Sequence, residues 1–430
     1  MRAVKKIIVF LLSSVGFLCV LAWATFVMMR ASRPPTPPDG SPIVYPWGAM
    51  HVDTHREEPD SDLEKAIAAS IMSESEDRFD PDHDGVCEYA VLVLSGGGSA
   101  GAFGAGLLSG WSKSGTRPDF KIVTGVSAGS LQATFAFLGP EYDDDLTAVF
   151  TEYASEDIYE RRTILGALLG DAAWGAEGLK KLIANHITSE VLEAVAAKHA
   201  EGHRLFVGTA NIDTGEFTIW NMGAIASSNK PGKLEHYRKV LLASSAIPVL
   251  FPPVYLPVEI GGELYYEMHV DGGSQSQLFL RGFMLDFEET LQETGIDDKS
   301  ETSIYVIRNG VAQEGVSRHI VDASSVSIAS ATITGVFDLS TESSLFRVWV
   351  LSQHHDVDFN LAAIPDGMFP SLTPTEFDLD VMGRIYAYAY GEAEKGYVWA
   401  KQPPGLDIVE QFDGEEDRPD GTRNPDPEKD

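Results

Sequence analysis

The chain has 430 residues, of which 44% are hydrophobic and 22% charged, and its formal net charge is −32. This length and composition fit one large globular domain with appended segments. The acidic excess argues against a nucleic-acid partner, which needs a basic stripe, and against electrostatic docking on anionic lipid. The two cysteines, Cys19 and Cys87, do not make a disulfide framework.

The N-terminal segment, residues 1–30, is predicted to be a transmembrane anchor or a signal segment. Residues 7–29 are 23 residues without a charge, which is long enough to span a bilayer. The basic residues before them favour an N-terminus in the cytoplasm, which places the following domain on the periplasmic side. The alternative is a cleaved signal peptide with its site at residues 22–24, which would leave a secreted or periplasmic protein.

Residues 31–87 are predicted to be a Pro-rich and acidic linker. Four prolines within residues 33–38 favour a stiff, extended chain. Residues 60–75 have apolar side chains at helical spacing and predict a short helix. Residues 80–85 superficially match the start of a calcium loop, but Val91 stands where its closing acidic ligand should be. We therefore predict a polar turn there and no metal.

A glycine-rich loop follows the first predicted strand of the main domain. Residues 89–94 are a continuous apolar run, which is typical of a parallel strand covered on both faces. Residues 95–101 read Ser-Gly-Gly-Gly-Ser-Ala-Gly, and a helix is expected over residues 103–111. Glycines let the backbone approach a ligand closely, and N–H groups at the start of a helix form an anion site.

Residues 125–129 read Gly-Val-Ser-Ala-Gly, between a predicted strand and a predicted apolar helix. A serine at a sharp strand-to-helix turn is presented to substrate. The flanking Gly125 and Gly129 fit this turn because it is strained and the chain packs closely around it. The helix also points its positive N-terminal end at the serine oxygen. Ser127 is therefore the candidate nucleophile of a nucleophile elbow.

Two functional interpretations compete for the glycine-rich loop. Its spacing formally matches a dinucleotide-binding fingerprint, but that site also needs an acidic residue closing the second strand. The second strand, residues 121–124, leads instead into the elbow. The loop is better interpreted as an oxyanion hole for Ser127, made by backbone N–H groups of Gly96, Gly97 and Gly98. A tight turn without a ligand remains as the third alternative.

The middle of the chain predicts alternating helices and strands. Helices are expected over 146–159 and 175–200, strands over 205–209, 217–220 and 303–307, and a closing helix over 376–401. The apolar residues 164–170 form either a buried helix or a mobile cover that meets lipid. Residues 406–430 are acidic, with prolines and glycines, and are predicted to be a disordered tail.

The candidate base for Ser127 is Asp271. Residues 264–270 look like a strand, and Asp271 would sit at its end, followed by two glycines that leave the carboxylate uncrowded. His269 has a strand-end position too, but it lies two residues before this better candidate. An Asp-Gly-Gly sequence is by itself commonly just a turn.

Together these segments resemble the patatin-like phospholipase family. The glycine-rich loop, the elbow and the Asp271 motif occur in the family's order, and the run of residues 243–253 agrees with a fourth family motif. The resemblance implies a three-layer α/β/α fold with a mainly parallel sheet over residues 88–405. It also implies a Ser127–Asp271 dyad that uses no histidine and no cofactor. Ala100 departs from the Arg or Lys that the family often has there, which puts headgroup preference in doubt.

The predicted function is hydrolysis of carboxylic esters of phospholipids or lysophospholipids at a membrane or micelle surface, as in enzymes of the phospholipase A or lysophospholipase type. One alternative is a membrane-tethered protein that binds lipid or a partner without turnover. The other is a carboxylesterase acting on small esters.

Overall fold

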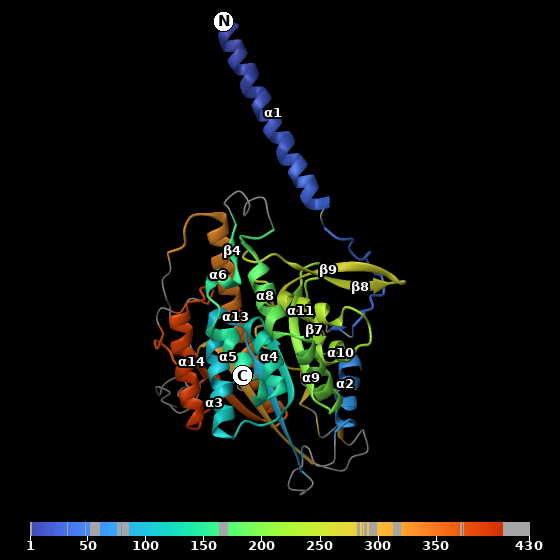
Figure 1. The fold of residues 1–430 in the computed structure, drawn as a ribbon, viewed down its shortest axis with the longest axis vertical. Coiled ribbons are helices and arrows are strands. Elements are labelled where there is room, and N and C mark those ends of the chain that lie inside the picture. The colour runs from blue at the N-terminus through green and yellow to red at the C-terminus, as the bar shows by residue number, and fades with distance from the viewer. Residues whose placement is uncertain are drawn as a thin grey trace, which may run out of the picture.

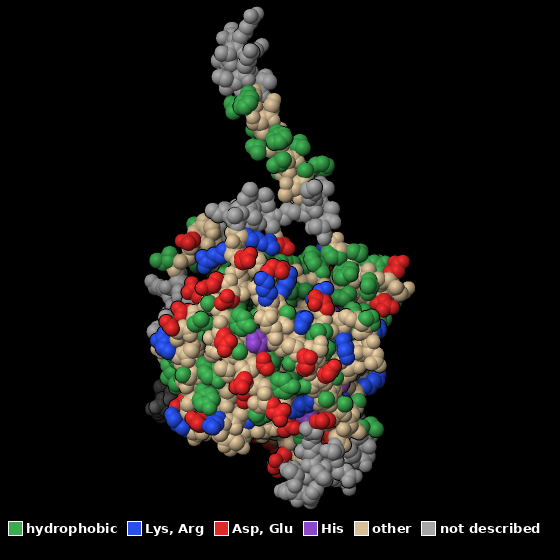
Figure 2. Space-filling view, in the orientation of Figure 1, with side chains coloured by type: hydrophobic (Ala, Val, Ile, Leu, Met, Phe, Trp, Pro, Cys, Tyr) green, Lys and Arg blue, Asp and Glu red, His purple; other side chains and the backbone are tan. Residues whose placement is uncertain are grey.

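A computed structural model describes residues 2–406, except for positions 32, 48, 52–60, 75–78, 80–85, 163–170, 282–283, 286, 288–289, 292–298, 313–319, 370–371 and 373. The polar segment 80–85, the apolar segment 164–170 and the tail from residue 407 onward lie outside the described residues. Figure 2 shows acidic side chains spread over the visible face of the molecule, in keeping with the net charge of −32.

Within the described residues, the centre of the fold is one nine-stranded mixed sheet. Its parallel part has the order β11-β10-β2-β3-β6, and each of these strands pairs in parallel with the next. The bounds are β2 (Val86–Leu94), β3 (Phe120–Val126), β6 (Arg204–Asn211), β10 (Lys299–Val311) and β11 (Asp358–Ile364).

Antiparallel strands extend the sheet beyond β6. On one side β7 (Glu216–Asn221) pairs with β6 and then with β1 (Ala49–His51). The hairpin β8 (Val254–Ile260) and β9 (Glu263–Asp271) joins through β9, which also pairs with β6. A small separate sheet is formed by β4 (Glu160–Arg161) and β5 (Trp174–Gly175).

Helices cover both faces of the sheet, which gives three layers (Figure 1). Alternate side chains of each buried strand point to opposite faces, so the sheet feeds two separate apolar cores. One core contains Leu92 and Val123 with side chains from α3, α4, α5, α8, α9, α10, α11 and α14. The other contains Val91 and Ile122 with side chains from α2 and α13. The predicted α/β/α fold is confirmed.

The bounds of these helices are as follows: α2 (Ser61–Ile71), α3 (Gly101–Ser114), α4 (Ala128–Leu138), α5 (Asp143–Thr151), α6 (Ser155–Ile158), α8 (Glu177–His186), α9 (Ser189–Ala200), α10 (Met222–Ser227), α11 (Lys233–Ser244), α13 (Ser325–His354) and α14 (Leu379–Glu394).

The N-terminal helix α1 (Arg2–Ala31) coincides with the predicted anchor and projects away from the layered domain in Figure 1. In the part of the chain whose side chains are described, no helix combines the length and the apolar character that crossing a membrane requires.

The segment that follows α1 runs along the domain. Arg33 forms an ion pair with Asp213 (Nη2–Oδ1, 2.5 Å), and the backbone N–H of Tyr266 donates to the carbonyl of Pro35 (2.9 Å). Val44 then makes an isolated antiparallel bridge with Glu259 beside β8. The predicted short helix within 60–75 is α2, and its Ser70 hydroxyl is hydrogen-bonded to the Gly202 carbonyl (2.5 Å).

Three predicted helices differ in extent from the observed ones. Residues 146–159 are split into α5 and α6, and residues 175–200 into α8 and α9. The second break has a local cause, because the Thr188 hydroxyl caps α9 by accepting from the Val191 N–H (3.3 Å). The closing helix α14 is shorter than predicted, since the Asp378 carboxylate caps its start and Gly396 follows its end with φ of 97°.

Candidate active site

Ser127 lies in a sharp turn between β3 and α4. Its backbone has φ of 55° and ψ of −125°, an unusual conformation for a residue with a side chain. A Cβ on Gly125 would lie 2.4 Å from the Gly129 carbonyl oxygen, and one on Gly129 would lie 2.4 Å from the Leu94 carbonyl oxygen. Only glycine therefore fits on either side of the elbow.

Sheet pairing brings Asp271 to this turn. In the register, Val126 at the end of β3 is opposite Gly208 of β6, and the next residue, Thr209, is opposite Asp271 at the end of β9. The backbone N–H of Asp271 also donates to the carbonyl of Ala246 (2.9 Å). Ser127 and Asp271 are far apart in the sequence, and this β3–β6–β9 ladder places them in one site.

The Asp271 carboxyl group is fully buried and only half satisfied. Its Oδ1 accepts a hydrogen bond from the Gly273 N–H (2.8 Å), while its Oδ2 has no full hydrogen bond from any described residue. Burial raises the pKa of Asp271 to about 7, against the smaller lowering effects of the Ser127 hydroxyl and the Gly273 N–H. A carboxylate with this pKa and a free oxygen beside a serine has the properties of a general base.

The glycine-rich loop lies directly against Ser127. A Cβ on Gly96 would be 3.0 Å from the Ser127 Cβ. Gly97 and Gly98 have φ of 154° and 55°, and added Cβ atoms would lie 1.8 Å from the Asn309 carbonyl oxygen and 1.9 Å from the Pro374 carbonyl oxygen. Among the described residues, no acceptor takes the N–H groups of Gly96, Gly97 or Gly98. Unpaired backbone donors next to a serine oxygen suit an oxyanion.

A buried amide network that the sequence analysis missed holds this loop. Asn309, at the C-terminal end of β10, donates from Nδ2 to the Ser95 carbonyl (2.8 Å) and to Gln132 Oε1 (2.8 Å). Gln132 in turn donates to the Gly101 carbonyl (2.6 Å), and the Gly104 N–H donates to Asn309 Oδ1 (3.1 Å). A polar Asn shortly after the apolar run of residues 304–307 was the available signal. Asn309 and Gln132 are positioning residues.

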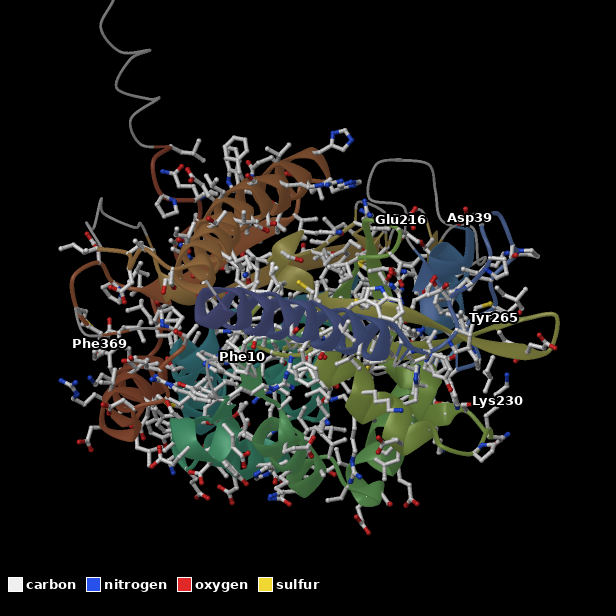
Figure 3. All side chains as sticks on the ribbon, turned by 90° about the horizontal axis from the view of Figure 1, so that it is seen from above. Phe10, Asp39, Glu216, Lys230, Tyr265 and Phe369 are labelled. Carbon is white, nitrogen blue, oxygen red and sulfur yellow. The ribbon has the colours of Figure 1, made fainter. Side chains whose placement is uncertain are left out.

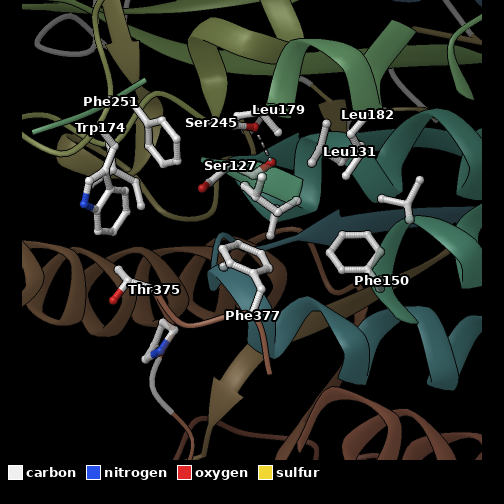
Figure 4. Close-up of a pocket in the computed structure, with 16 residues that line it drawn as sticks. Ser127, Leu131, Phe150, Trp174, Leu179, Leu182, Ser245, Phe251, Thr375 and Phe377 are labelled. Atoms are coloured by element: carbon white, nitrogen blue, oxygen red, sulfur yellow. Dashed lines mark hydrogen bonds between the residues drawn. The ribbon is translucent and has the colours of Figure 1, made fainter. Parts of the chain in front are cut away.

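The run of residues 243–253 supports the elbow from the other side. The Ser127 N–H donates to the Ser244 hydroxyl (3.0 Å), which donates onward to the Gly208 carbonyl (2.7 Å). The Ser245 hydroxyl donates to the Ser127 carbonyl (3.4 Å), the contact drawn as a dashed line in Figure 4. These serines fix the backbone of the turn and leave the Ser127 side chain free to face the pocket.

A narrow, mostly apolar pocket opens at Ser127 (Figure 4). Its cavity volume is about 50 Å³. Its polar lining groups come mainly from Ser127, Ser245 and Thr375, and its walls are aliphatic and aromatic. The lining residues are Gly98, Ser127, Ala128, Leu131, Val149, Phe150, Ile158, Trp174, Leu179, Leu182, Ser245, Ile247, Phe251, Pro374, Thr375 and Phe377. No charged side chain is among them, so the pocket suits a hydrocarbon chain better than a headgroup.

His269, the other candidate base, is packed in the core beside β6. Its Nδ1 lies 3.0 Å from the Thr209 hydroxyl, its Nε2 lies 3.6 Å from Glu267 Oε2, and its ring is 5.6 Å from that of Trp220. Ala100, where the family often has a basic residue, is also buried. In the ranges that the structure describes, no group of three or more His, Cys, Asp or Glu side chains is placed to hold a metal ion.

Comparisons with known proteins give matches to a family model, to a curated protein and to a solved structure. The model of a family described as patatin-like phospholipase matches residues 92–284, which include Ser127 and Asp271. A protein named cGAMP-activated phospholipase, from Pseudomonas aeruginosa, is 31% identical over 179 residues. That match covers 39% of this chain and spans half of the relative's length. The crystal structure of VipD from Legionella pneumophila is similar with a TM-score of 0.35 and 12% identity, over 71% of this chain and 66% of the other.

Proposed function

We propose that this chain, whose residues 92–284 match the patatin-like phospholipase family model, is a lipid acyl hydrolase with Ser127 and Asp271 as its catalytic pair. The family match supports lipid acyl hydrolysis in general. The observation that carries the finer proposal is the half-satisfied, buried carboxyl of Asp271 beside the strained Ser127. Phospholipids or lysophospholipids are the proposed substrates.

The first half of the reaction forms an acyl-enzyme. The Ser127 hydroxyl oxygen attacks the ester carbonyl carbon while Asp271 Oδ2 takes the hydroxyl proton. The carbonyl oxygen becomes an oxyanion, which the N–H groups of Gly97 and Gly98 stabilise by hydrogen bonding. The intermediate then collapses, the C–O bond to the leaving alcohol breaks, and Asp271 returns the proton to that alcohol.

The second half releases the fatty acid. A water molecule replaces the alcohol and loses a proton to Asp271 as it attacks the acyl carbon. The same oxyanion forms and collapses, and the Ser127 oxygen leaves with the proton from Asp271. The pair therefore works in both halves without a histidine, because one carboxyl with a pKa of about 7 accepts and returns protons near neutral pH.

The apolar lining of the pocket supports the acyl chain, and not the headgroup, as the part of the substrate that is recognised. Leu131, Phe150 and Leu182 extend the pocket away from Ser127, and no lining residue carries a charge that would hold a phosphate. The headgroup would then lie outside the pocket, where discrimination between headgroups is weaker.

The test is labelling of the full chain with a fluorophosphonate probe, followed by peptide mass mapping, beside Ser127→Ala. Label on Ser127 that disappears in the variant is the expected result. Folded protein that takes no label would overturn the proposal in favour of a non-catalytic lipid- or partner-binding role.

A substrate panel then separates the enzymatic alternatives. We expect the hydrolysis rate to rise with acyl chain length and to increase sharply above the critical micelle concentration of the substrate. A rate that is highest on short, monomeric esters would identify a carboxylesterase instead.

A further inference from the structure

Helix α13 carries two apolar faces, and only one of them is covered. Its inner face packs Leu345 and Val348 into the core on the sheet. Its outer face carries large apolar side chains that are each between 42% and 66% exposed, namely Ile328, Val336, Leu339, Phe346 and Val350. Figure 3 shows α13 at the margin of the molecule, with side chains projecting outward. A helix that is apolar on opposite sides normally has both sides buried.

The outer face has the spacing of a coiled-coil seam. Val336, Leu339, Ser343, Phe346 and Val350 are separated by three, four, three and four residues, which corresponds to alternating a and d positions of a heptad. Successive turns therefore bring these side chains into one straight stripe along the helix. We call these five residues the α13 seam.

Charged residues flank the α13 seam in a pattern that specifies an orientation. Glu342 occupies a g position and Arg347 the following e position, both are exposed, and neither forms an ion pair within the described part of the chain. In a parallel pair of helices, a g residue lies next to the e residue five positions later on the partner, so Glu342 would meet Arg347 of the other copy twice. An antiparallel pair would place like charges together.

We propose that the α13 seam is a dimer interface, which a second copy of this chain covers in parallel orientation. The seam supplies the apolar contact, and the two Glu342–Arg347 pairs set register and direction. A two-fold pair of this kind uses the same surface patch on both copies.

The covered face of α13 links this interface to the segment after Asp271. The Gln277 N–H donates to the Ser340 hydroxyl (3.1 Å), and the hydroxyls of Ser276 and Ser344 are 3.1 Å apart. Gln277 itself packs where a Cβ on Gly96 would be 2.2 Å from its Oε1. Docking a second copy on the outer face would therefore stabilise α13, which contacts the segment around Gln277 beside the glycine-rich loop.

The first test is sedimentation velocity on the full chain in one non-ionic detergent, over a range of concentrations. We expect a reversible dimer whose dissociation constant rises about 100-fold or more in Leu339→Glu, because this change places a charge at the centre of the apolar interface. Ser127→Ala is expected to dimerise like the wild type, so failure of the proposed catalysis would not be confused with failure of the dimer. A monomer at all concentrations, or a dimer that Leu339→Glu leaves unchanged, would overturn the proposal.

Charge reversal tests register and direction without changing the apolar contact. Glu342→Lys and Arg347→Glu are each expected to weaken the dimer about tenfold, because each creates two like-charge contacts. The double variant E342K/R347E is expected to restore it, since the pairs reform with opposite polarity. Equal weakening in single and double variants would contradict the parallel g-to-e pairing.

Cysteine cross-linking gives an independent readout. In a Cys19→Ser background, Ser343→Cys places a cysteine at an a position, where the two copies meet, and mild oxidation should yield a disulfide-linked dimer. Thr334→Cys lies on the same helix but off the seam, and it is the matched control. Equal cross-linking of the two variants, or vesicle binding by a strictly monomeric protein that Leu339→Glu abolishes, would overturn the dimer interface.

Discussion

Two buried ionisable side chains, at opposite ends of the sheet, differ in how completely their polar atoms are hydrogen-bonded. Lys121 on β3 is fully buried, yet its ammonium group has the Glu74 carboxylate and the Gly202 carbonyl (2.8 Å) as partners and lies over the Phe79 ring. Asp271 on β9 is equally buried, yet one of its carboxyl oxygens has no full hydrogen bond within the described residues.

This difference in hydrogen bonding distinguishes a side chain with a structural role from one with a proposed catalytic role. Burial lowers the pKa of Lys121, and the nearby Arg204 guanidinium lowers it further. Lys121 joins β3 to the chain just after α2. In Asp271 the carboxyl oxygen without a full hydrogen bond is the atom that would accept a proton during the proposed reaction. Lys121 therefore makes structural contacts, and Asp271 is the group that we propose takes part in the reaction.

The largest expected effect is at the elbow. Ser127→Ala should lower the hydrolysis rate by about four orders of magnitude or more, because it removes the hydroxyl that lies beside the oxyanion donors. Stability should barely change, since the alanine keeps the Cβ that the turn already accommodates. Rates on a micellar lysophospholipid, with Ser109→Ala in α3 as the control for a buried serine, measure this. More than a tenth of the wild-type rate in Ser127→Ala would exclude Ser127 as the nucleophile.

Asp271→Asn should lower the rate by about three orders of magnitude, because the amide keeps the shape of the carboxyl but cannot accept the Ser127 proton. Glu267→Gln, a buried carboxyl-to-amide change on the same strand, is the matched control and should retain most activity. A comparable loss in both variants would mean that β9 is disturbed rather than that a base is lost.

Asp271→Asn should also raise the free energy of unfolding at alkaline pH. The folded-state pKa of Asp271 is raised from 3.8 to about 7, so the stability that its neutral form contributes is complete below pH 4 and is lost as the pH rises through 7. The asparagine stays neutral throughout. We expect a gain of roughly 2–4 kcal/mol in the free energy of unfolding at pH 8, shrinking toward zero near pH 4, measured by urea denaturation. A gain that does not depend on pH would argue against a buried, charged Asp271.

Lys121→Met should lower the free energy of unfolding, in contrast to Asp271→Asn, which should raise it at alkaline pH. Lys121→Met removes the ammonium partner of Glu74 and leaves that mostly buried carboxylate with the Tyr89 hydroxyl (3.0 Å) in place of a counter-charge, which costs about 3–5 kcal/mol. The rate per folded molecule should stay near that of the wild type, since Lys121 lies at the other end of β3 from Ser127. Urea denaturation compared with Lys113→Met, an exposed lysine on α3, tests this. An equal loss of stability in both variants would remove the contrast between the two ends of the sheet.

The parts of the site that could be predicted from the sequence are those with a local signal. The apolar strands before residues 95 and 125 end in glycines, and the β9 strand ends in Asp-Gly-Gly, so each motif marks its own turn. The order of these strands then constrains the sheet, because parallel strands put their C-terminal ends at one edge.

The parts that could not be predicted depend on contacts between distant residues or on helices without a single apolar face. Asn309 and Gln132 meet across 177 residues, and nothing near either residue predicts the pairing. Helix α13 lacks the one-sided pattern that identifies a surface helix, since it is apolar both toward the sheet and along the α13 seam. The sequence analysis therefore predicted no helix there.

The smallest expected effect is the pH dependence of the rate. It tests whether the titration of Asp271 alone sets the activity. If Asp271 is the base, kcat/KM should fall about tenfold per pH unit below pH 7, because only the ionised carboxyl accepts the Ser127 proton. His269→Gln should keep this limb at the same pH, even if packing against Trp220 is weakened. A limb that moves in His269→Gln would instead assign the titration to the histidine, whereas one near pH 4 would mean that Asp271 of the free enzyme ionises as readily as an exposed carboxyl.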